Sequence, residues 1–288
     1  MEINIKIVLD SIAPNQARLT TLDVTMPRFL LAQLNTHRQF SRNSASSRAV
    51  PTPKMLERIN QHPFVPEEWG TNQRGMQAGP ALSGASAEAA RDTWLACRDA
   101  VIRSVQRLHE LGVHKQLANR LLEPFMWVTV IVSSTEWANF FNLRCHEDAQ
   151  PELRKVARMM ADALASSTPQ PVGIGQWHLP YVQKDERTEL PLEVQQQCSV
   201  ARCARVSYLT HEGKRDVGKD RELYERLLGG SGFGHWSPFE HVATPRATDF
   251  PDTREGNFRG WLQYRKMFAD ECQTVWPRRE ESGEVPSA

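Results

Sequence analysis

The run FMWVTVIVSS, residues 125–134, constrains the fold more than any other part of the chain. It consists mainly of apolar and β-branched side chains, which favour a strand buried within a sheet. A helix that crosses a membrane needs about 20 apolar residues, and no run in this sequence approaches that length. We therefore expect a buried strand here, inside a folded domain.

Two segments near the N-terminus, residues 3–8 and 18–25, alternate polar and apolar side chains. Successive side chains of a strand point to opposite faces, so this alternation predicts two strands. Helices are predicted where apolar residues recur at helical spacing or where start and stop signals occur. These segments are residues 26–40, 86–112, 114–123, 135–149, 151–167 and 220–229.

Proline, serine and glycine predict several of the helix ends. Pro27 is placed to open the first helix, Ser86 to cap the second, and Gly112 to stop it. Pro124 is expected to end the short third helix. Pro151 predicts either the first residue of a helix or a kink between two helical segments.

Strands and helices do not alternate regularly along the chain, as they would in a parallel-sheet protein. The pattern therefore predicts a mixed α and β fold. Residues 49–85 are rich in Pro, Gly, Asn and Gln and predict a long, mostly irregular excursion, which in a compact domain is more often functional than incidental. Residues 168–193 predict a surface link and residues 198–209 a short element, and we expect the tail after Trp276 to be disordered.

Composition limits the classes of function. The chain has 288 residues and a formal net charge of +1, which gives no reason to expect a polyanion such as duplex DNA as partner. The N-terminus lacks the continuous apolar core of a signal peptide. Five cysteines are few and odd in number, so we expect no disulfide framework and a cytoplasmic location. Cys198 and Cys203 are expected to be buried thiols, because no second Cys or His pair has the spacing of a zinc site.

The stretch NTHRQFSRNSASSRAVP, residues 35–51, gathers cationic and hydroxyl side chains. It holds His37, Arg38, Arg42 and Arg48 with four serines set among them. Guanidinium groups offer forked donors and serine lets the backbone approach closely, so the stretch suits an anion with many oxygens. A solvated polar loop is the alternative.

The stretch NFFNLRCHEDAQPELR, residues 139–154, is the second that carries chemistry. Arg144 stands among apolar residues, which indicates a cation at the edge of a pocket, aimed at a ligand carbonyl. The alternative is an ordinary surface pair between Arg144 and Asp148, four residues apart on a helix. Cys145 is expected to have a packing role. His146, Glu147 and Asp148 cannot converge on one metal ion from consecutive helix positions, so no metal site is expected.

The first of these stretches resembles the signature of flavin-dependent thymidylate synthases. The pattern is matched at six positions, which are His37, Arg38, Ser41, Asn43, Ser46 and Arg48. Residues 139–154 resemble the second signature of the family, and NQRGMQ at 72–77 weakly resembles one of its loops. GHWSPFEH, at 234–241, resembles a third segment that normally precedes the signature but here lies far beyond it.

This motif order implies a circularly permuted chain. The resemblance implies one domain over residues 1–288, with a core at 1–167 that holds both signatures. Residues 194–276 would correspond to the N-terminal part of the family, because CARVSYL and the helix after it resemble the usual forerunner of the third segment. The matched pieces cover about two thirds of the chain.

The resemblance also implies an α+β fold, with a mainly antiparallel sheet packed with helices. It implies methylation of dUMP at C5 to dTMP, with methylenetetrahydrofolate as carbon donor, FAD as redox cofactor and NADPH as reductant. The protein would act as a homotetramer with shared active sites, with no nucleic acid or membrane partner. Arg144 would stabilise negative charge on the pyrimidine, and His235 would lie close to flavin and folate as a second catalytic residue.

Carrying the family pattern across implies two sets of binding residues. The dUMP set is Gln33, Ser44, Ser46, Ser47, Arg48, Arg120 and Arg144, with Arg48 and Arg120 nearest the phosphate. The FAD set is Thr36, His37, Arg38, Asn43, Ser133, Thr135, Asn139 and Ser237.

Three positions depart from the family pattern. Thr36 replaces an arginine, Ser44 replaces a glutamate, and Asp148 stands where histidine is frequent. These changes leave a second enzyme function open, in which a related protein releases a hydroxymethyl product or methylates another pyrimidine nucleotide. A flavin- or nucleotide-binding protein without catalysis is a third hypothesis, and an unrelated α+β domain with an arginine-rich loop is a fourth.

Overall fold

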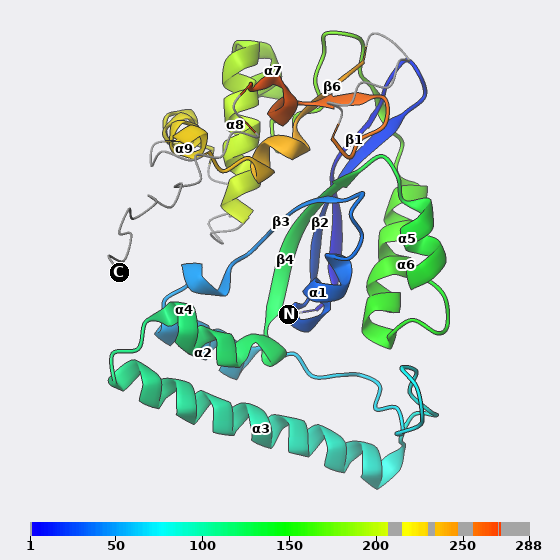
Figure 1. Cartoon of the computed structure of the whole chain (residues 1–288), viewed down its shortest axis with the longest axis vertical. Coiled ribbons are helices and arrows are strands. Elements are labelled where there is room, and N and C mark those ends of the chain that lie inside the picture. Colours follow the sequence, from blue (N-terminus) through cyan, green and yellow to red (C-terminus); the bar gives the residue numbers. More distant parts are fainter. Residues whose placement is uncertain (1, 207–214, 230–233, 247–255, 270, 272–288) are drawn as a thin grey trace, which may run out of the picture.

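The protein is described from a computed structural model, which places residues 2–206, 215–229, 234–246, 256–269 and 271. At its centre lies a five-stranded sheet of order β3-β4-β2-β1-β5 (Figure 1). The strands are β1 (Asn4–Ile12), β2 (Arg18–Pro27), β3 (Ser41–Ser44), β4 (Trp127–Ser134) and β5 (Gln170–Pro171). All neighbours pair antiparallel except β5, which runs parallel to β1. The expected α+β fold with a mainly antiparallel sheet is therefore confirmed.

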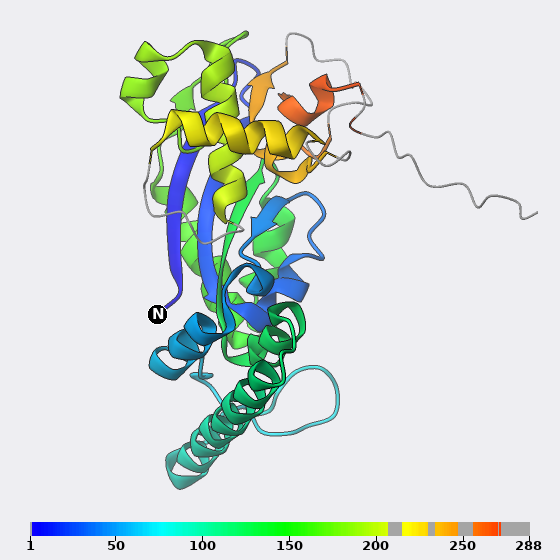
Figure 2. The ribbon, with the colours of Figure 1, turned by 90° about the vertical axis from the view of Figure 1, so that its left-hand side faces the viewer.

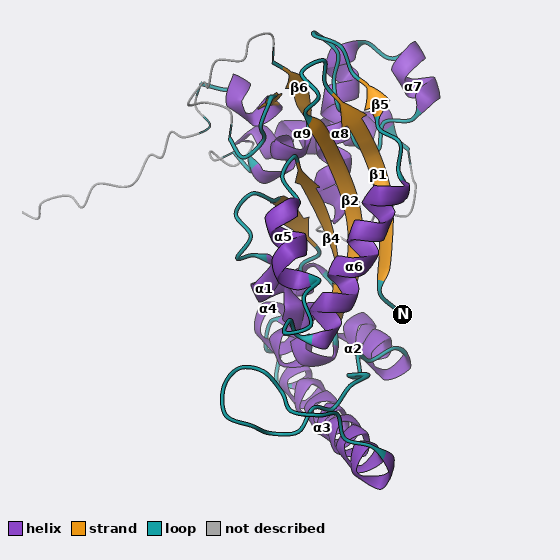
Figure 3. Cartoon of the chain, turned by 90° about the vertical axis from the view of Figure 1, so that its right-hand side faces the viewer, coloured by secondary structure: helices purple, strands orange, loops and turns teal. Residues whose placement is uncertain are grey.

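The alternation of β2 gives the sheet one apolar and one polar face. Leu22, Val24 and Met26 are fully buried in the main hydrophobic core. Helices α5 (Ala138–Arg144) and α6 (Pro151–Ser166) cover this apolar face (Figure 3). Thr21 and Asp23 point to the opposite face, because successive side chains of a strand alternate. The sheet can therefore bury a core on one side and hold polar groups on the other.

Three helices gather on the opposite side of the sheet from α6, near one end of the strands (Figure 2). They are α7 (Lys184–Glu189), α8 (Leu192–Arg205) and α9 (Val217–Gly229). Every residue of α8 from Gln195 to Ala204 is buried. The short sheet formed by β6 (Ala243–Pro245) and β7 (Trp261–Gln263) lies beside them, with 3₁₀ turns at Ser237–His241 and Tyr264–Met267.

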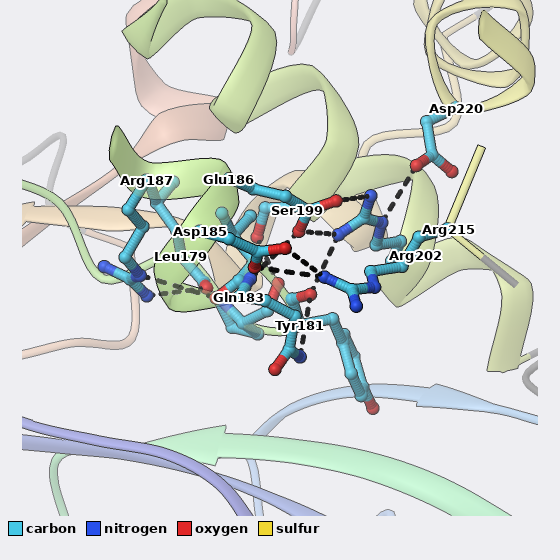
Figure 4. Close-up of polar contacts among 12 residues, drawn as sticks. Leu179, Tyr181, Gln183, Asp185, Glu186, Arg187, Ser199, Arg202, Arg215 and Asp220 are labelled. Atoms are coloured by element: carbon cyan, nitrogen blue, oxygen red, sulfur yellow. Dashed lines mark hydrogen bonds and ion pairs between the residues drawn. The ribbon is translucent and has the colours of Figure 1, made fainter. Parts of the chain in front are cut away.

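A buried arginine joins these three helices (Figure 4). Arg202 donates to both carboxylate oxygens of Glu186 at 2.6 Å and to Asp220 Oδ2 at 2.8 Å. Its Nη1 also donates to the carbonyl of Tyr181 at 3.0 Å, and Arg205 forms a second ion pair with Asp220. The hydrogen bonds from Arg202 lower the pKa of Glu186. A charge buried this deeply is tolerated only because it is paired.

The other end of the sheet packs against α2 (Thr52–Gln61), α3 (Gly84–Glu110), α4 (Lys115–Ala118) and the 3₁₀ segment Asn119–Phe125. Val105 of α3 packs with Met55, Leu122 and Phe125 in a second core. Figure 1 shows the long helix α3 lying across this end of the molecule. Across the described residues, no helix has the length and apolar composition needed to cross a membrane.

Several predicted boundaries were wrong. The helix expected over 26–40 shrinks to a 3₁₀ turn at Arg28–Leu30 and α1 (Leu31–Leu34), because Pro27 pairs with Trp127 as the last residue of β2. His37 therefore lies in a loop. Ser83, not Ser86, precedes α3, and Pro124 lies within a 3₁₀ segment.

Other expectations were wrong in content. The expected short element near 198–209 is the 14-residue helix α8, whereas the excursion over 49–85 is mostly irregular, as expected, and contains α2. The expected surface link contains His178 and Leu179, which are buried. Pro151 does begin α6, as one of the two readings predicted. The predicted tail after Trp276 lies outside the described residues.

The thiol predictions were confirmed. Cys198 and Cys203 are free and buried within α8. Cys145 packs against the main core, and burial raises the pKa of its thiol. A thiol in this state is not poised as a nucleophile.

Candidate functional site

The two signature stretches meet at one hydrogen bond. Arg144, the last residue of α5, donates from Nε to Nε2 of His37 at 2.9 Å. The His37 ring also packs edge-on against Phe140, with ring centroids 4.9 Å apart. Burial lowers the pKa of His37, and the charges of Arg144 and Arg42 lower it further. The imidazole is therefore neutral near pH 7, with Nε2 as an acceptor and the proton on Nδ1.

This contact replaces the alternative pairing of Arg144 with Asp148. Helix α5 ends at Arg144, so Asp148 does not lie one turn along the same helix. Asp148 pairs instead with His146, at 3.3 Å between Nδ1 and Oδ2. With Nε on His37 and no carboxylate partner among the described residues, the two terminal nitrogens of Arg144 remain available for a ligand.

The four cationic side chains of residues 35–51 divide by role. Arg42 donates to the backbone carbonyls of His37 at 2.8 Å and Leu34 at 3.2 Å, so it folds the loop. Arg38 and Arg48 are exposed, and no described carboxylate pairs with either guanidinium. The loop therefore presents two open cations on a backbone that Arg42 holds in place.

The amide of Gln33 links the loop to the second signature. Its Nε2 donates to Oε1 of Gln150 at 2.5 Å, just before α6 begins. Thr36, which departs from the family pattern, donates its hydroxyl to the carbonyl of Gln33 at 2.7 Å and closes the end of α1. Thr36 is thus bonded to the backbone.

The serines near Arg48 are less open than expected. Ser47 is buried and donates to Oε1 of Glu123 at 2.9 Å. Arg120 donates to the same oxygen at 2.9 Å. Ser46 accepts a hydrogen bond from the backbone N–H of Arg48 at 3.3 Å. Arg120 and Ser47 therefore share Glu123, which partly neutralises the arginine.

Asn43 and the segment from far along the chain meet on the polar face of the sheet. The side chain of Asn43 lies 3.0 Å from Ser237 Oγ and 2.9 Å from His241 Nε2. His241 Nδ1 lies 2.8 Å from Ser133 Oγ on β4. Gln263, on β7, donates to Ser41 Oγ at 3.0 Å. The segment Ser237–His241 therefore closes over β3, although almost 200 residues separate them in sequence.

The predicted site residues lie on two sides of the edge strand β3. Asn43 pairs with Ile131 and Ser44 with Val130, and paired residues point to the same face of the sheet. Ser44 therefore points toward the face covered by α5, and Asn43 toward the Ser237–His241 segment. A ligand that contacts both groups must wrap around this edge.

Asn139, His235 and Thr135 have no side-chain hydrogen bond to another predicted site residue in the described part of the chain. Asn139 and His235 are exposed, and the backbone N–H of His235 donates to the carbonyl of Leu227 at 2.7 Å. Thr135 accepts from the backbone N–H of Arg259 at 2.9 Å. Within the described residues, no three His, Cys, Asp or Glu side chains gather as metal ligands.

A cavity of about 630 Å³ adjoins the second signature. Its wall includes Trp69, Met76 and Gln77 from the excursion before α3, and Gln150 and Arg154 from the start of α6. None of the predicted site residues lines it. Gln33 reaches it only through its hydrogen bond to Gln150.

Sequence reasoning missed the polar residues that support the site from behind. His241 lies within the resembling stretch GHWSPFEH but was given no role. Thr21, His178 and Gln263 are buried and hydrogen bonded. The alternation of Thr21 with Leu22 signalled a polar face, whereas nothing in the local sequence marked Gln263.

The fold and the site define an α+β protein in which open arginines lie at the edge of an antiparallel sheet. The family model described as thymidylate synthase complementing protein matches residues 15–170, more than half of the chain. The chain belongs to this family.

Among solved structures, the chain is similar to two crystal structures of the UMP/dUMP methylase PolB from Streptomyces cacaoi. The structure bound with 5-Br dUMP is 17% identical with a TM-score of 0.47, covering 57% of this chain and 90% of that chain. The structure bound with 5-Br UMP is 18% identical with a TM-score of 0.47, covering 57% and 89%. No curated protein matches this chain.

Proposed function

We propose that the chain is a flavin-dependent methylase that converts dUMP to dTMP. The observation that supports this most strongly is the contact between Arg144 and His37, which joins the two signatures of the family. A neutral histidine that accepts from Nε leaves the terminal nitrogens of Arg144 free to face a pyrimidine carbonyl. C5 of uracil is a weak nucleophile, and a guanidinium placed at the ring can stabilise the negative charge that builds when it reacts.

The residues present fit FAD and a nucleotide phosphate. Arg38 and Arg48 are exposed without carboxylate partners in the described part of the chain, and such cations suit phosphate oxygens. His37, Asn43 and Ser237 add polar groups around β3. When bound, FAD would supply the hydride for the reaction, with NADPH as reductant and methylenetetrahydrofolate as carbon donor.

The chain's own residues would position these groups. Arg42 fixes the loop, so that Arg38 and Arg48 are presented from a defined backbone. Gln33, Ser46 and Arg120 would contact dUMP, and Thr135 and Asn139 the flavin. Ser133, which the family pattern also assigns to the flavin, is fully buried and bonded to Thr21 and His241, so it would support the site from behind. The exposed ring of His235 would lie toward flavin and folate. The contacts of Ser237–His241 with β3 support a circularly permuted chain, whose late segment completes the site, and a homotetramer would complete it further.

The test is the mass of the nucleotide formed anaerobically from dUMP, methylenetetrahydrofolate, FAD and NADPH. The proposal predicts dTMP in the wild type and in Arg103→Ala, an exposed α3 control, and almost none in Arg144→Ala. Unchanged dUMP in the wild type despite bound flavin would contradict it. So would equal turnover by Arg144→Ala.

Thr36 and Ser44, which depart from the family pattern, are the basis for a second candidate reaction. Thr36 is bonded to the backbone of Gln33, and Ser44 is half-buried on the side of β3 that faces α5. The family pattern has an arginine and a glutamate at these positions. The alternative product of a site rebuilt in this way is a hydroxymethylated nucleotide, and the same mass measurement separates that product from dTMP.

A further inference from the structure

A line of hydrogen-bonded side chains crosses the polar face of the sheet from the candidate site to β1. Each consecutive pair of polar atoms lies between 2.6 and 3.0 Å apart. All members except the first are buried. In order they are Ser237, Asn43, His241, Ser133, Thr21, His178 and Ser11.

The orientation of the Asn43 amide determines which atom donates and which accepts in each hydrogen bond of this line. One end of the amide lies 3.1 Å from the backbone carbonyl of Ser237 and 3.3 Å from that of Arg42. Carbonyl oxygens only accept hydrogen bonds, so Nδ2 must occupy that end. Nδ2 then also donates to Nε2 of His241 at 2.9 Å, and Oδ1 accepts from the hydroxyl of Ser237 at 3.0 Å.

The same order of donors and acceptors determines which ring nitrogen of each histidine carries the proton. His241 and His178 are fully buried, and burial lowers the pKa of each, so each ring carries one proton. His241 accepts at Nε2, so its proton is on Nδ1 and is donated to Ser133. Ser133 then donates to Thr21, and Thr21 to Nε2 of His178, because the opposite order would leave a buried hydroxyl without an acceptor. His178 in turn donates from Nδ1 to Ser11.

We propose that this line sets the exposed hydroxyl of Ser237 as a hydrogen-bond acceptor toward the ligand. Its proton is committed to Asn43 Oδ1, so only its lone pairs face outward. The partner is then a ligand hydrogen-bond donor, and among the donors on the rings of the proposed ligands we choose the neutral imide N–H, which a flavin ring and a uracil base share. The ligand part of this inference rests on the proposed function, whereas the line itself does not.

The position of the proton on each histidine ring tests the order of donors and acceptors in the line, and this measurement needs no ligand. In protein labelled with ¹⁵N-histidine, two-bond nitrogen–proton spectra distinguish the two neutral forms of each ring. His241 and His178, assigned with His241→Gln and His178→Gln, should both carry the proton on Nδ1. A proton on Nε2 of His241 in the wild type would overturn the inference.

Two substitutions show whether the residues are coupled in the predicted direction. Asn43→Asp replaces the donor with a carboxylate, so Nε2 of His241 should gain a proton. Thr21→Val cuts the line beyond Ser133, so His241 should keep its proton on Nδ1 while His178 loses its fixed form. A His241 ring unchanged by Asn43→Asp would overturn the coupling, even if Thr21→Val fails to fold.

Methylated ligands test the acceptor and identify its partner. FAD methylated at N3 and dUMP methylated at N3 both lack the imide N–H. The wild type should bind one of them about tenfold more weakly than its parent, and Ser237→Ala should bind that pair equally. Equal discrimination in wild type and Ser237→Ala would overturn the acceptor role. No binding of either parent would overturn the proposed function instead, and the ring protons would still decide the line.

Discussion

Two clusters of arginines in this molecule are built in opposite ways. In the helical corner of α7, α8 and α9, Arg202 is buried, and Glu186 and Asp220 take its hydrogen bonds. Around β3, Arg38 and Arg48 are exposed with no carboxylate partner in the described residues, and the Arg144 side chain donates to a neutral histidine. We call the first cluster closed, because its charges are already paired, and the second open, because its arginines lack carboxylate partners among the described residues.

The difference separates folding from binding. A buried cation that is already paired contributes to holding helices in place and has nothing left for a ligand. A cation whose neighbours carry no negative charge remains free to bind an incoming anion. The comparison therefore assigns stability to the corner and ligand binding to the edge of the sheet.

The largest effect is expected in the closed cluster. Arg202→Met leaves the carboxylates of Glu186 and Asp220 buried without that partner, and loss of one partner of a buried pair costs about 3–5 kcal/mol. Urea unfolding should show this loss, while Arg103→Met should change stability by less than about 0.5 kcal/mol. A loss below about 1 kcal/mol for Arg202→Met would mean that the corner is not held by its charges.

Arg144→Ala should have the largest effect on activity and a small effect on folding. Removal of a group that stabilises developing charge typically lowers kcat by about 10²–10³-fold. Its unfolding midpoint in urea should stay close to that of the wild type. Equal losses of stability and of activity would place Arg144 with the closed cluster.

Arg38→Ala and Arg48→Ala should weaken ligand binding without weakening the fold. Loss of one charge-assisted hydrogen bond, worth about 1.5–3 kcal/mol, should raise the Kd for FAD or dUMP about tenfold or more. Calorimetric titration with each ligand assigns each arginine to its partner. Unchanged affinity for both ligands would show that these cations are only solvated, as expected if the segment is an ordinary polar loop.

A smaller effect is expected from pH, through the buried His241. Burial lowers the pKa of His241 to about 3, whereas the unfolded chain takes up the proton near pH 6.5. The unfolded state therefore binds more protons between these values, so stability falls as the pH drops below about 6.5. His241→Asn should remove about 1 kcal/mol of the loss between pH 7 and pH 5.5, measured by urea unfolding. Identical pH dependence in both proteins would contradict a buried neutral ring.

The sequence predicted the parts of the fold that rest on local pattern. The alternation in β2 and the apolar run of β4 predicted the strands, and the start of α6 at Pro151 was one of the two interpretations of that proline. It failed where a distant partner decided the conformation. Pro27 has helix-opening character but pairs with Trp127 in the sheet, so a residue 100 positions away overrode local propensity.

The same limit applied to the site. The motifs identified Arg144 and His37 separately, but their hydrogen bond joins residues 107 positions apart. Local spacing offered Asp148 as the partner of Arg144, because it assumed that the helix continued. The His241 contact with Asn43 spans 198 positions. Only the three-dimensional arrangement could show that these groups meet.

The central claim is that the arginines at the edge of the sheet are kept open for ligands. The most direct measurement is the unfolding temperature of the wild type and of the double variant Arg38→Ala, Arg48→Ala, each with and without FAD and dUMP. A ligand that binds only the folded state raises this temperature. The account predicts equal temperatures for the two unliganded proteins, a rise on ligand addition in the wild type, and little or no rise in the variant. An equal rise in both proteins, or no rise in the wild type, would contradict it.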